Sequence, residues 1–142
     1  MIIIAHRGNL DGPSNLENSP KKISEALELG YDAEIDVRYL DRKWYLGHDG
    51  PQYEVSQNFL EQNGLWCHAK NIEALFQLRK IGARCFWHQE DDVTLTSCGH
   101  LWTYPGKELT SLSVCVMPEN SGILELNGIF GVCTDYARKW RN

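Results

Sequence analysis

The chain has 142 residues, which predicts one domain over residues 1–142 that buries about 70% of its unfolded surface. Apolar residues make up 42% and charged residues 23% of the sequence, as is ordinary for a soluble globular protein. The net charge of −5 argues against a nucleic-acid partner, but a local Arg, Lys or metal ion could still attract a small anionic substrate.

The first predicted strand and helix lie near the N-terminus. The continuous apolar run 2–5 predicts a strand that is covered on both faces. Ser19 and Pro20 predict the start of a helix, because serine caps free N–H groups and proline fits the first turn. Gly30 predicts the end of this helix, and the next strand is expected at 33–37.

A hairpin is expected directly after this strand. Asp41 and Arg42 stand at its turn, and 43–47 forms the returning strand. Residues 57–63 then predict a short helical turn before another apolar strand at 65–69.

A second helix repeats the signals of the first. Asn71 predicts its N-cap and Gly82 its end. Its expected apolar stripe comprises Ile72, Leu75 and Leu78. The next strand is expected at 84–88.

Three further strands are expected in the C-terminal half, at 100–104, 113–117 and 131–135. The stretches 107–112 and 118–129 between them leave room for at most a turn or two of helix. The helices therefore shrink along the chain while the strands continue.

Strands that alternate with helices predict an α/β fold with mainly parallel strands. Because a complete (β/α)₈ barrel takes about 250 residues, we expect an abbreviated TIM-type barrel with reduced helices in the C-terminal half. An open sheet is the alternative. Missing helices would expose apolar strand faces, which favours self-association into a homo-oligomer.

The cysteines and apolar runs bear on the cellular compartment. Four of the five cysteines lie in apolar runs, and no CxxC pair occurs, so buried reduced thiols are expected rather than a zinc cage or redox pair. The first apolar run is too short for a secretory signal, and none approaches the roughly 20 residues of a membrane span. We therefore expect a cytoplasmic protein without a membrane span.

Two carboxylates are expected side by side on the strand 33–37. Glu34 and Asp36 are two residues apart, so their side chains point to the same face. Such a pair repels unless a cation or a shared proton lies between its members. His6 and His48 flank the pair in the sequence and could move protons near neutral pH. The pattern predicts a metal-assisted hydrolase.

Polar or aromatic side chains also follow most of the other predicted strands at their carboxyl ends, where α/β folds collect their functional groups. These side chains are His6, Arg7, Glu34, Asp36, His68, Lys70, His88, Trp102 and Asp135.

Several segments, in this order and at these separations, resemble the glycerophosphodiester phosphodiesterase family. They are IAHRG, LENS, AEIDV and GHD, and GVCTDYA is similar to the family's final-strand pattern. The resemblance is strong over roughly 1–50 and looser beyond it. It implies a TIM-barrel fold and the hydrolysis of small glycerophosphodiesters to glycerol 3-phosphate and an alcohol, with a divalent cation.

Carried over residue by residue, the resemblance implies roles for five side chains. His6 and His48 would be the catalytic acid–base pair, Glu34 and Asp36 would be metal ligands, and Arg7 would contact the phosphate. These residue types suit the chemistry, because a phosphodiester is an anion whose developing charge must be neutralised.

The sequence departs from the family pattern at the strand 65–69. The family usually has an acid where His68 stands, whereas Lys70 fits the pattern as a substrate contact. His68 as a third ligand would shift preference from Mg²⁺ or Ca²⁺ toward Mn²⁺, Zn²⁺ or other transition metals. A site that has lost its metal is the alternative.

Other residues and functions stay open at this level. Glu17 either contacts the substrate or precedes the helix cap, and Trp102 either forms an apolar wall for the leaving alcohol or belongs to the core. Asp135 either joins the site or caps a short final helix at 136–140. The functional alternatives are a catalytically silent relative that binds a phosphorylated ligand or a partner protein, and an enzyme that stops at a cyclic phosphate.

Overall fold

The fold is given by a computed structural model that describes residues 1–123 and 126–141. Within these ranges the strands are β1 (Ile2–His6), β2 (Asp32–Leu40), β3 (Lys43–Leu46), β4 (Tyr53–Val55), β5 (Leu65–Ala69), β6 (Cys85–Phe86), β7 (Val93–Leu95), β8 (Leu101–Thr103), β9 (Ser113–Val116) and β10 (Gly131–Thr134). The helices are α1 (Pro20–Glu28), α2 (Gln57–Leu60), α3 (Ile72–Lys80), α4 (Pro118–Ser121) and α5 (Ala137–Trp140).

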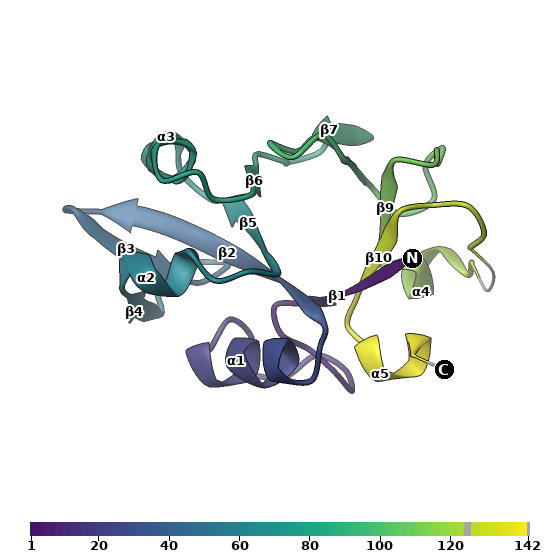
Figure 1. The fold of residues 1–142 in the computed structure, drawn as a ribbon, viewed down its shortest axis with the longest axis horizontal. Helices are drawn as coiled ribbons and strands as arrows, with labels where there is room; N and C mark the ends of the chain where they lie inside the picture. The colour runs from purple at the N-terminus through teal and green to yellow at the C-terminus, as the bar shows by residue number, and fades with distance from the viewer. Residues whose placement is uncertain (124–125, 142) are drawn as a thin grey trace.

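The strands form one curled, mixed sheet, with α1, α3 and α5 outside the curve (Figure 1). Parallel pairs run in the order β6-β5-β2-β1-β10-β9-β8. The hairpin β3-β4 adds to β2, and β7 adds to β8, by antiparallel pairing. Taken from β8 to β6, the parallel strands β8, β9 and β10 follow the order of the chain, as do β1, β2, β5 and β6, and β1 lies beside β10.

The α/β class is confirmed, but a complete barrel is not shown. Across the described residues, no strand ladder joins β6 to β7 or β8. Isolated hydrogen bonds connect the segments on the two sides of this gap instead. The Ser97 amide donates to the Cys85 carbonyl at 2.9 Å, and Thr94 Oγ1 donates to the Trp87 carbonyl at 2.9 Å. The sheet is a curled half-barrel whose helices are short in the C-terminal half, as expected from the spacing of the strands.

Most predicted elements are found within a few residues of their expected bounds. Ser19 Oγ accepts a hydrogen bond from Lys22 N and Asn71 Oδ1 from Ala74 N, so both predicted N-caps are confirmed. Asp41 and Arg42 both adopt positive φ, as a tight hairpin turn requires. In the predicted 118–129 stretch, α4 supplies one short helix, and residues 124–125 lie outside the described chain.

The predicted apolar stripe of α3 is wrong at its first residue. Ile72 is 72% exposed, whereas Ala74 and Leu78 are fully buried. Asn71 fixes where the helix starts, and residues 74 and 78 are one turn apart on the face toward the sheet. Ile72 points away from that face.

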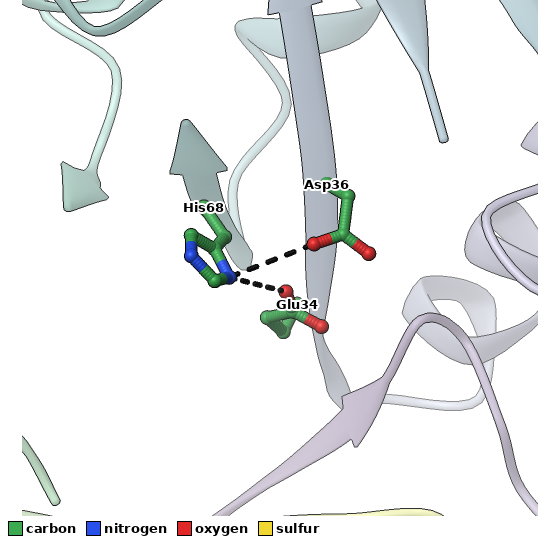
Figure 2. Close-up of side chains that lie close together, drawn as sticks. All are labelled: Glu34, Asp36 and His68. Carbon is green, nitrogen blue, oxygen red and sulfur yellow. Dashed lines mark ion pairs between the residues drawn. The ribbon is translucent and has the colours of Figure 1, made fainter. Parts of the chain in front are cut away.

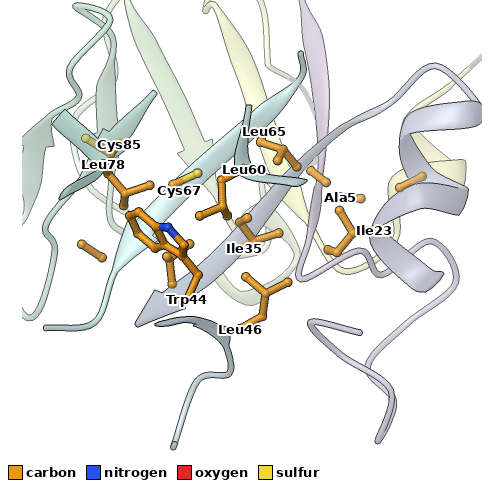
Figure 3. Close-up of a cluster of buried hydrophobic side chains, with 14 of the residues drawn as sticks. Ala5, Ile23, Ile35, Trp44, Leu46, Leu60, Leu65, Cys67, Leu78 and Cys85 are labelled. Atoms are coloured by element: carbon orange, nitrogen blue, oxygen red, sulfur yellow. The ribbon is translucent and has the colours of Figure 1, made fainter. Parts of the chain in front are cut away.

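The core has two parts, on opposite faces of the sheet. The larger part packs the convex face against the helices and includes Ile23, Ile35 and Leu78 (Figure 3). The smaller part lies on the other face and takes one residue from each of six parallel strands. These residues are Ile4, Trp66, Phe86, Trp102, Val114 and Cys133. None of the helices in the described ranges is long and apolar enough to cross a membrane.

Candidate functional site

The candidate site lies one layer above this smaller core, toward the carboxyl ends of the parallel strands. Side chains alternate along a strand, so the residue two positions after each core residue faces the same way. These residues are His6, His68, His88, Tyr104, Val116 and Asp135. Together with Glu34 and Asp36 of β2, most of them line a cavity of about 380 Å³.

Nearly all of the predicted site residues border this one cavity. They are His6, Arg7, Glu34, Asp36, His48, His68, Lys70 and Trp102. Glu17 is not among its lining residues; its carboxylate accepts a hydrogen bond from Arg7 Nη1 at 2.9 Å. The geometry therefore gives Glu17 a contact with Arg7 rather than with the cavity.

The acidic pair of β2 is buried and held from the loop after β1. Glu34 and Asp36 are 2% and 1% exposed. Arg7 contacts both, with its main-chain N 3.3 Å from Glu34 Oε2 and its Nε 3.1 Å from Asp36 Oδ2. Asn18 Nδ2 donates to Asp36 Oδ2 at 2.9 Å, and its Oδ1 accepts from the Asp36 amide at 3.0 Å.

His68 of β5 faces both carboxylates (Figure 2). Its Nδ1 lies 3.7 Å from Glu34 Oε1 and 3.5 Å from Asp36 Oδ1. Atoms of these three residues lie within 4.8 Å of one another, and together they could hold a metal ion. A mixed set of two carboxylates and an imidazole suits a divalent cation of the transition series.

The pKa values of the two carboxyl groups are shifted in opposite directions. Burial alone would raise the pKa of Glu34, but contacts with His68 and His6 lower that pKa to about 2. Burial and the charge of Glu34 raise the pKa of Asp36. This separation is expected where two buried acids share one proton or one cation.

His6 has a carboxylate partner on each side of its ring. Its Nδ1 donates to Asp135 Oδ1 at 2.7 Å, while its Nε2 lies 3.8 Å from Glu34 Oε2. Burial disfavours the imidazolium, but Asp135 and Glu34 outweigh this effect and raise the pKa of His6. The group is therefore held in one orientation with Nε2 toward the acidic pair.

Asp135 does not cap the final helix. The N-cap of α5 is Tyr136, which makes no side-chain cap hydrogen bond. The Asp135 carboxylate instead binds His6 and accepts a bond from buried Asn9 Nδ2 at 2.8 Å. The alternative that placed Asp135 in the site is thus the one the geometry supports.

His48 reaches the same cavity from the loop after β3. Its side chain is 43% exposed, and its Nδ1 lies 2.8 Å from Asp49 Oδ1. Arg38 fixes the loop by donating to the carbonyls of Gly47 and His48. Gly47 is required there, because a Cβ at this position would lie 1.9 Å from the Gly50 carbonyl oxygen. Two histidines, each with its own carboxylate, therefore face one cavity.

Sequence reasoning missed several residues of the site. Asn18 was assigned no role, although its neighbour Glu17 was singled out, and the contact of Asn18 with Asp36 joins residues 18 apart. Met117 and Asn120 line the cavity from the N-cap and the interior of the short helix α4, and the sequence patterns singled out neither of them. Met117 has positive φ, which is uncommon for a side chain of this kind and marks a constrained position beside the site.

No family model matches this sequence, and no curated protein or solved structure matches it significantly. The resemblance to glycerophosphodiester phosphodiesterases accordingly stays a prediction.

Proposed function

We propose that the cavity is the active site of a metal-dependent phosphodiesterase that cleaves a small glycerophosphodiester-like substrate to a phosphomonoester and an alcohol. One observation carries the proposal: a three-residue ligand group, two carboxylate-paired histidines and two cationic side chains border the same cavity. A catalytically silent binding protein has no need of two histidines with carboxylate partners.

In this proposal Glu34, Asp36 and His68 would hold a divalent cation, Mg²⁺, Ca²⁺, Mn²⁺ or Zn²⁺. When bound, the cation supplies positive charge against the phosphate oxygens. Arg7 and Lys70 add positive charge at the cavity wall and would orient the phosphate. Arg7 is itself held by Glu17 and Asp36, so its guanidinium has one defined position.

The histidines would move the protons. One imidazole removes the proton of a substrate hydroxyl that attacks phosphorus, and the other donates a proton to the leaving alkoxide, so that the alcohol leaves and a cyclic phosphate forms. With the proton transfers reversed, the same two groups would assist the attack of water, which opens the cyclic phosphate to the phosphomonoester. Asp135 contacts Nδ1 of His6, and Asp49 contacts Nδ1 of His48. In each ring Nε2 is therefore the nitrogen that would exchange a proton with the substrate. Trp102 contributes an apolar part of the cavity wall, where the alcohol would lie.

The finer fold assignment belongs to the same proposal. We infer an abbreviated TIM-type barrel because adjacent parallel strands follow chain order and because one face of them bears a layered core beneath the site. Cytoplasmic location and self-association both stay predictions. Exposed Val93 and Leu95 on β7 supply apolar surface of the kind that favours self-association.

The test is the release of glycerol 3-phosphate from glycerophosphocholine and related diesters by the purified protein. Mg²⁺, Ca²⁺, Mn²⁺ and Zn²⁺ are added separately. We expect metal-dependent release that falls by at least about 100-fold in His6→Ala and in His48→Ala. His100→Ala is the matched control, because His100 stacks on Phe130 and is not among the cavity's lining residues.

Three outcomes separate the candidates. Release that persists in both histidine variants contradicts the acid–base roles. A cyclic phosphate that accumulates, seen by ³¹P NMR, identifies an enzyme that stops at the cyclic product. No release with any metal, together with retained binding of a phosphodiester, favours the silent relative.

A further inference from the structure

His68 has a defined neighbour at each ring nitrogen. Its Nε2 lies 2.8 Å from the His88 carbonyl oxygen, which can only accept, so Nε2 carries the hydrogen. In the neutral ring Nδ1 then carries an unprotonated lone pair. Nδ1 lies 3.7 Å from Glu34 Oε1 and 3.5 Å from Asp36 Oδ1. Three electron-rich groups that converge in this way need a cation or a proton between them. The far N–H of metal-binding histidines commonly bonds a main-chain carbonyl in the same manner.

An aromatic column fixes the plane of this ring. His68 stacks on Phe86 with centroids 4.9 Å apart and planes at 24°, and Phe86 stacks on Trp102 at 4.5 Å and 30°. His68 and Phe86 are register partners on β5 and β6. Phe86 and Trp102 are 2% and 3% exposed, so the imidazole cannot turn without breaking a buried stack.

We propose that Phe86 and the main-chain carbonyl of His88 hold His68 as a preset Nδ1 ligand, and that this makes the centre selective for transition-series cations such as Mn²⁺, Co²⁺ or Zn²⁺ over Mg²⁺ and Ca²⁺. Phe86 is a positioning residue, since it acts through His68. The inference rests on the metal centre of the proposed function but not on its reaction.

The selectivity follows from ligand chemistry. Mg²⁺ and Ca²⁺ prefer oxygen ligands, whereas imidazole nitrogen suits the transition-series cations. If the ring could turn away, only the two carboxylates would remain as protein ligands, and water would complete an all-oxygen ligand set. A ring that is held in place keeps nitrogen in the ligand set, so it favours only cations that bind nitrogen well.

The test is calorimetric titration of the metal-free protein with Co²⁺ and with Mg²⁺, each in the wild type and two variants. Phe86→Leu keeps an apolar side chain but removes the ring, and we expect Co²⁺ binding to weaken by about 10- to 100-fold. Mg²⁺ binding should stay nearly unchanged. Phe130→Leu is the matched control, because Phe130 packs on the same core cluster but stacks on His100 instead of His68.

A second measurement uses the wild type alone, so it does not depend on how the variants fold. The ¹⁵N resonances of His68 are recorded before and after Zn²⁺ is added. We expect Nδ1 to shift on binding and Nε2 to keep its hydrogen.

The proposal is overturned if the cation binds Nε2, if Co²⁺ and Mg²⁺ bind equally, if neither binds, or if the two leucine variants lose Co²⁺ affinity equally. Co²⁺ selectivity in a protein that cleaves no diester would contradict the proposed reaction and leave this inference standing. Diester cleavage without Co²⁺ selectivity would do the reverse.

Discussion

Asp135 gives His6 its orientation and biases its charge. The carboxylate accepts from His6 Nδ1 at 2.7 Å and from Asn9 at 2.8 Å, across more than 120 residues of chain. Burial works against the imidazolium, yet the pKa of His6 lies above its usual 6.5 because Asp135 and Glu34 stabilise the charged form. The raised pKa of His6 therefore stabilises the folded metal-free protein below about pH 6.5, and this contribution is lost as pH rises through the raised pKa. Because the same contact lowers the pKa of Asp135, the pair is also lost when acid protonates Asp135.

We predict that Asp135→Asn lowers the pKa of His6 in the metal-free protein. Asparagine keeps the shape of the side chain but removes the charge that favours the imidazolium. The pKa is measured by NMR titration of the histidine ring resonances. Asp49→Asn is the control, because Asp49 contacts His48 and should leave the pKa of His6 in place. Equal pKa values for His6 in wild type and Asp135→Asn would remove Asp135 as its electrostatic partner.

At the scale of elements, Asn71 joins α3 to the end of β2. Its Oδ1 accepts from Ala74 N at 3.1 Å, as an N-cap does, and also from Tyr39 N at 3.2 Å. Its Nδ2 donates to the Tyr39 carbonyl at 2.9 Å. One side chain thus satisfies the helix start and the part of β2 that runs beyond its pairing with β5.

We predict that Asn71→Ala lowers the free energy of unfolding by about 2–3 kcal/mol, since it removes a cap and two further hydrogen bonds. Ser56→Ala is the matched control, because Ser56 caps α2 through a single bond to Phe59 N and should cost only about 0.5–1 kcal/mol. Urea denaturation measures both. Equal losses would mean that the bonds to Tyr39 contribute nothing to stability.

Element positions followed from the sequence where a local signal marks them. Caps at Ser19 and Asn71 and the apolar run of β5 depend on neighbouring residues alone. β4 and β7 were missed, because each has only three residues and depends on pairing with a neighbouring strand. Local patterns do not record such pairing.

At the scale of the whole molecule, local signals predicted some residues of the candidate site, whereas other contacts depend on long-range pairing. Glu34 and Asp36 could be predicted as a pair because side chains two residues apart on a strand share a face, although both lie inside β2 rather than at its end. His6 and His68 could be predicted because they lie at or next to the ends of β1 and β5, and the curvature of the sheet brings all of these side chains together. The contact of His6 with Asp135 joins residues 129 apart. That position was foreseen as a strand end, but its partner depends on β10 returning beside β1.

The arrangement of the two core layers predicts two classes of thiol. Cys67, Cys85, Cys115 and Cys133 are at most 2% exposed, whereas Cys98 is exposed on the turn after β7. Burial also raises the pKa of the buried thiols, that of Cys115 to about 11, so few of them are thiolates near pH 8.

We expect one thiol of the native protein to react rapidly with a disulfide reagent, and the other four to react at least about 100-fold more slowly, when the sheet opens. Cys98→Ser should abolish the rapid phase, and all five thiols of the wild type should react at once in denaturant. A rapid phase that survives in Cys98→Ser would mean that β5, β6, β9 or β10 is accessible to solvent, which is incompatible with this sheet.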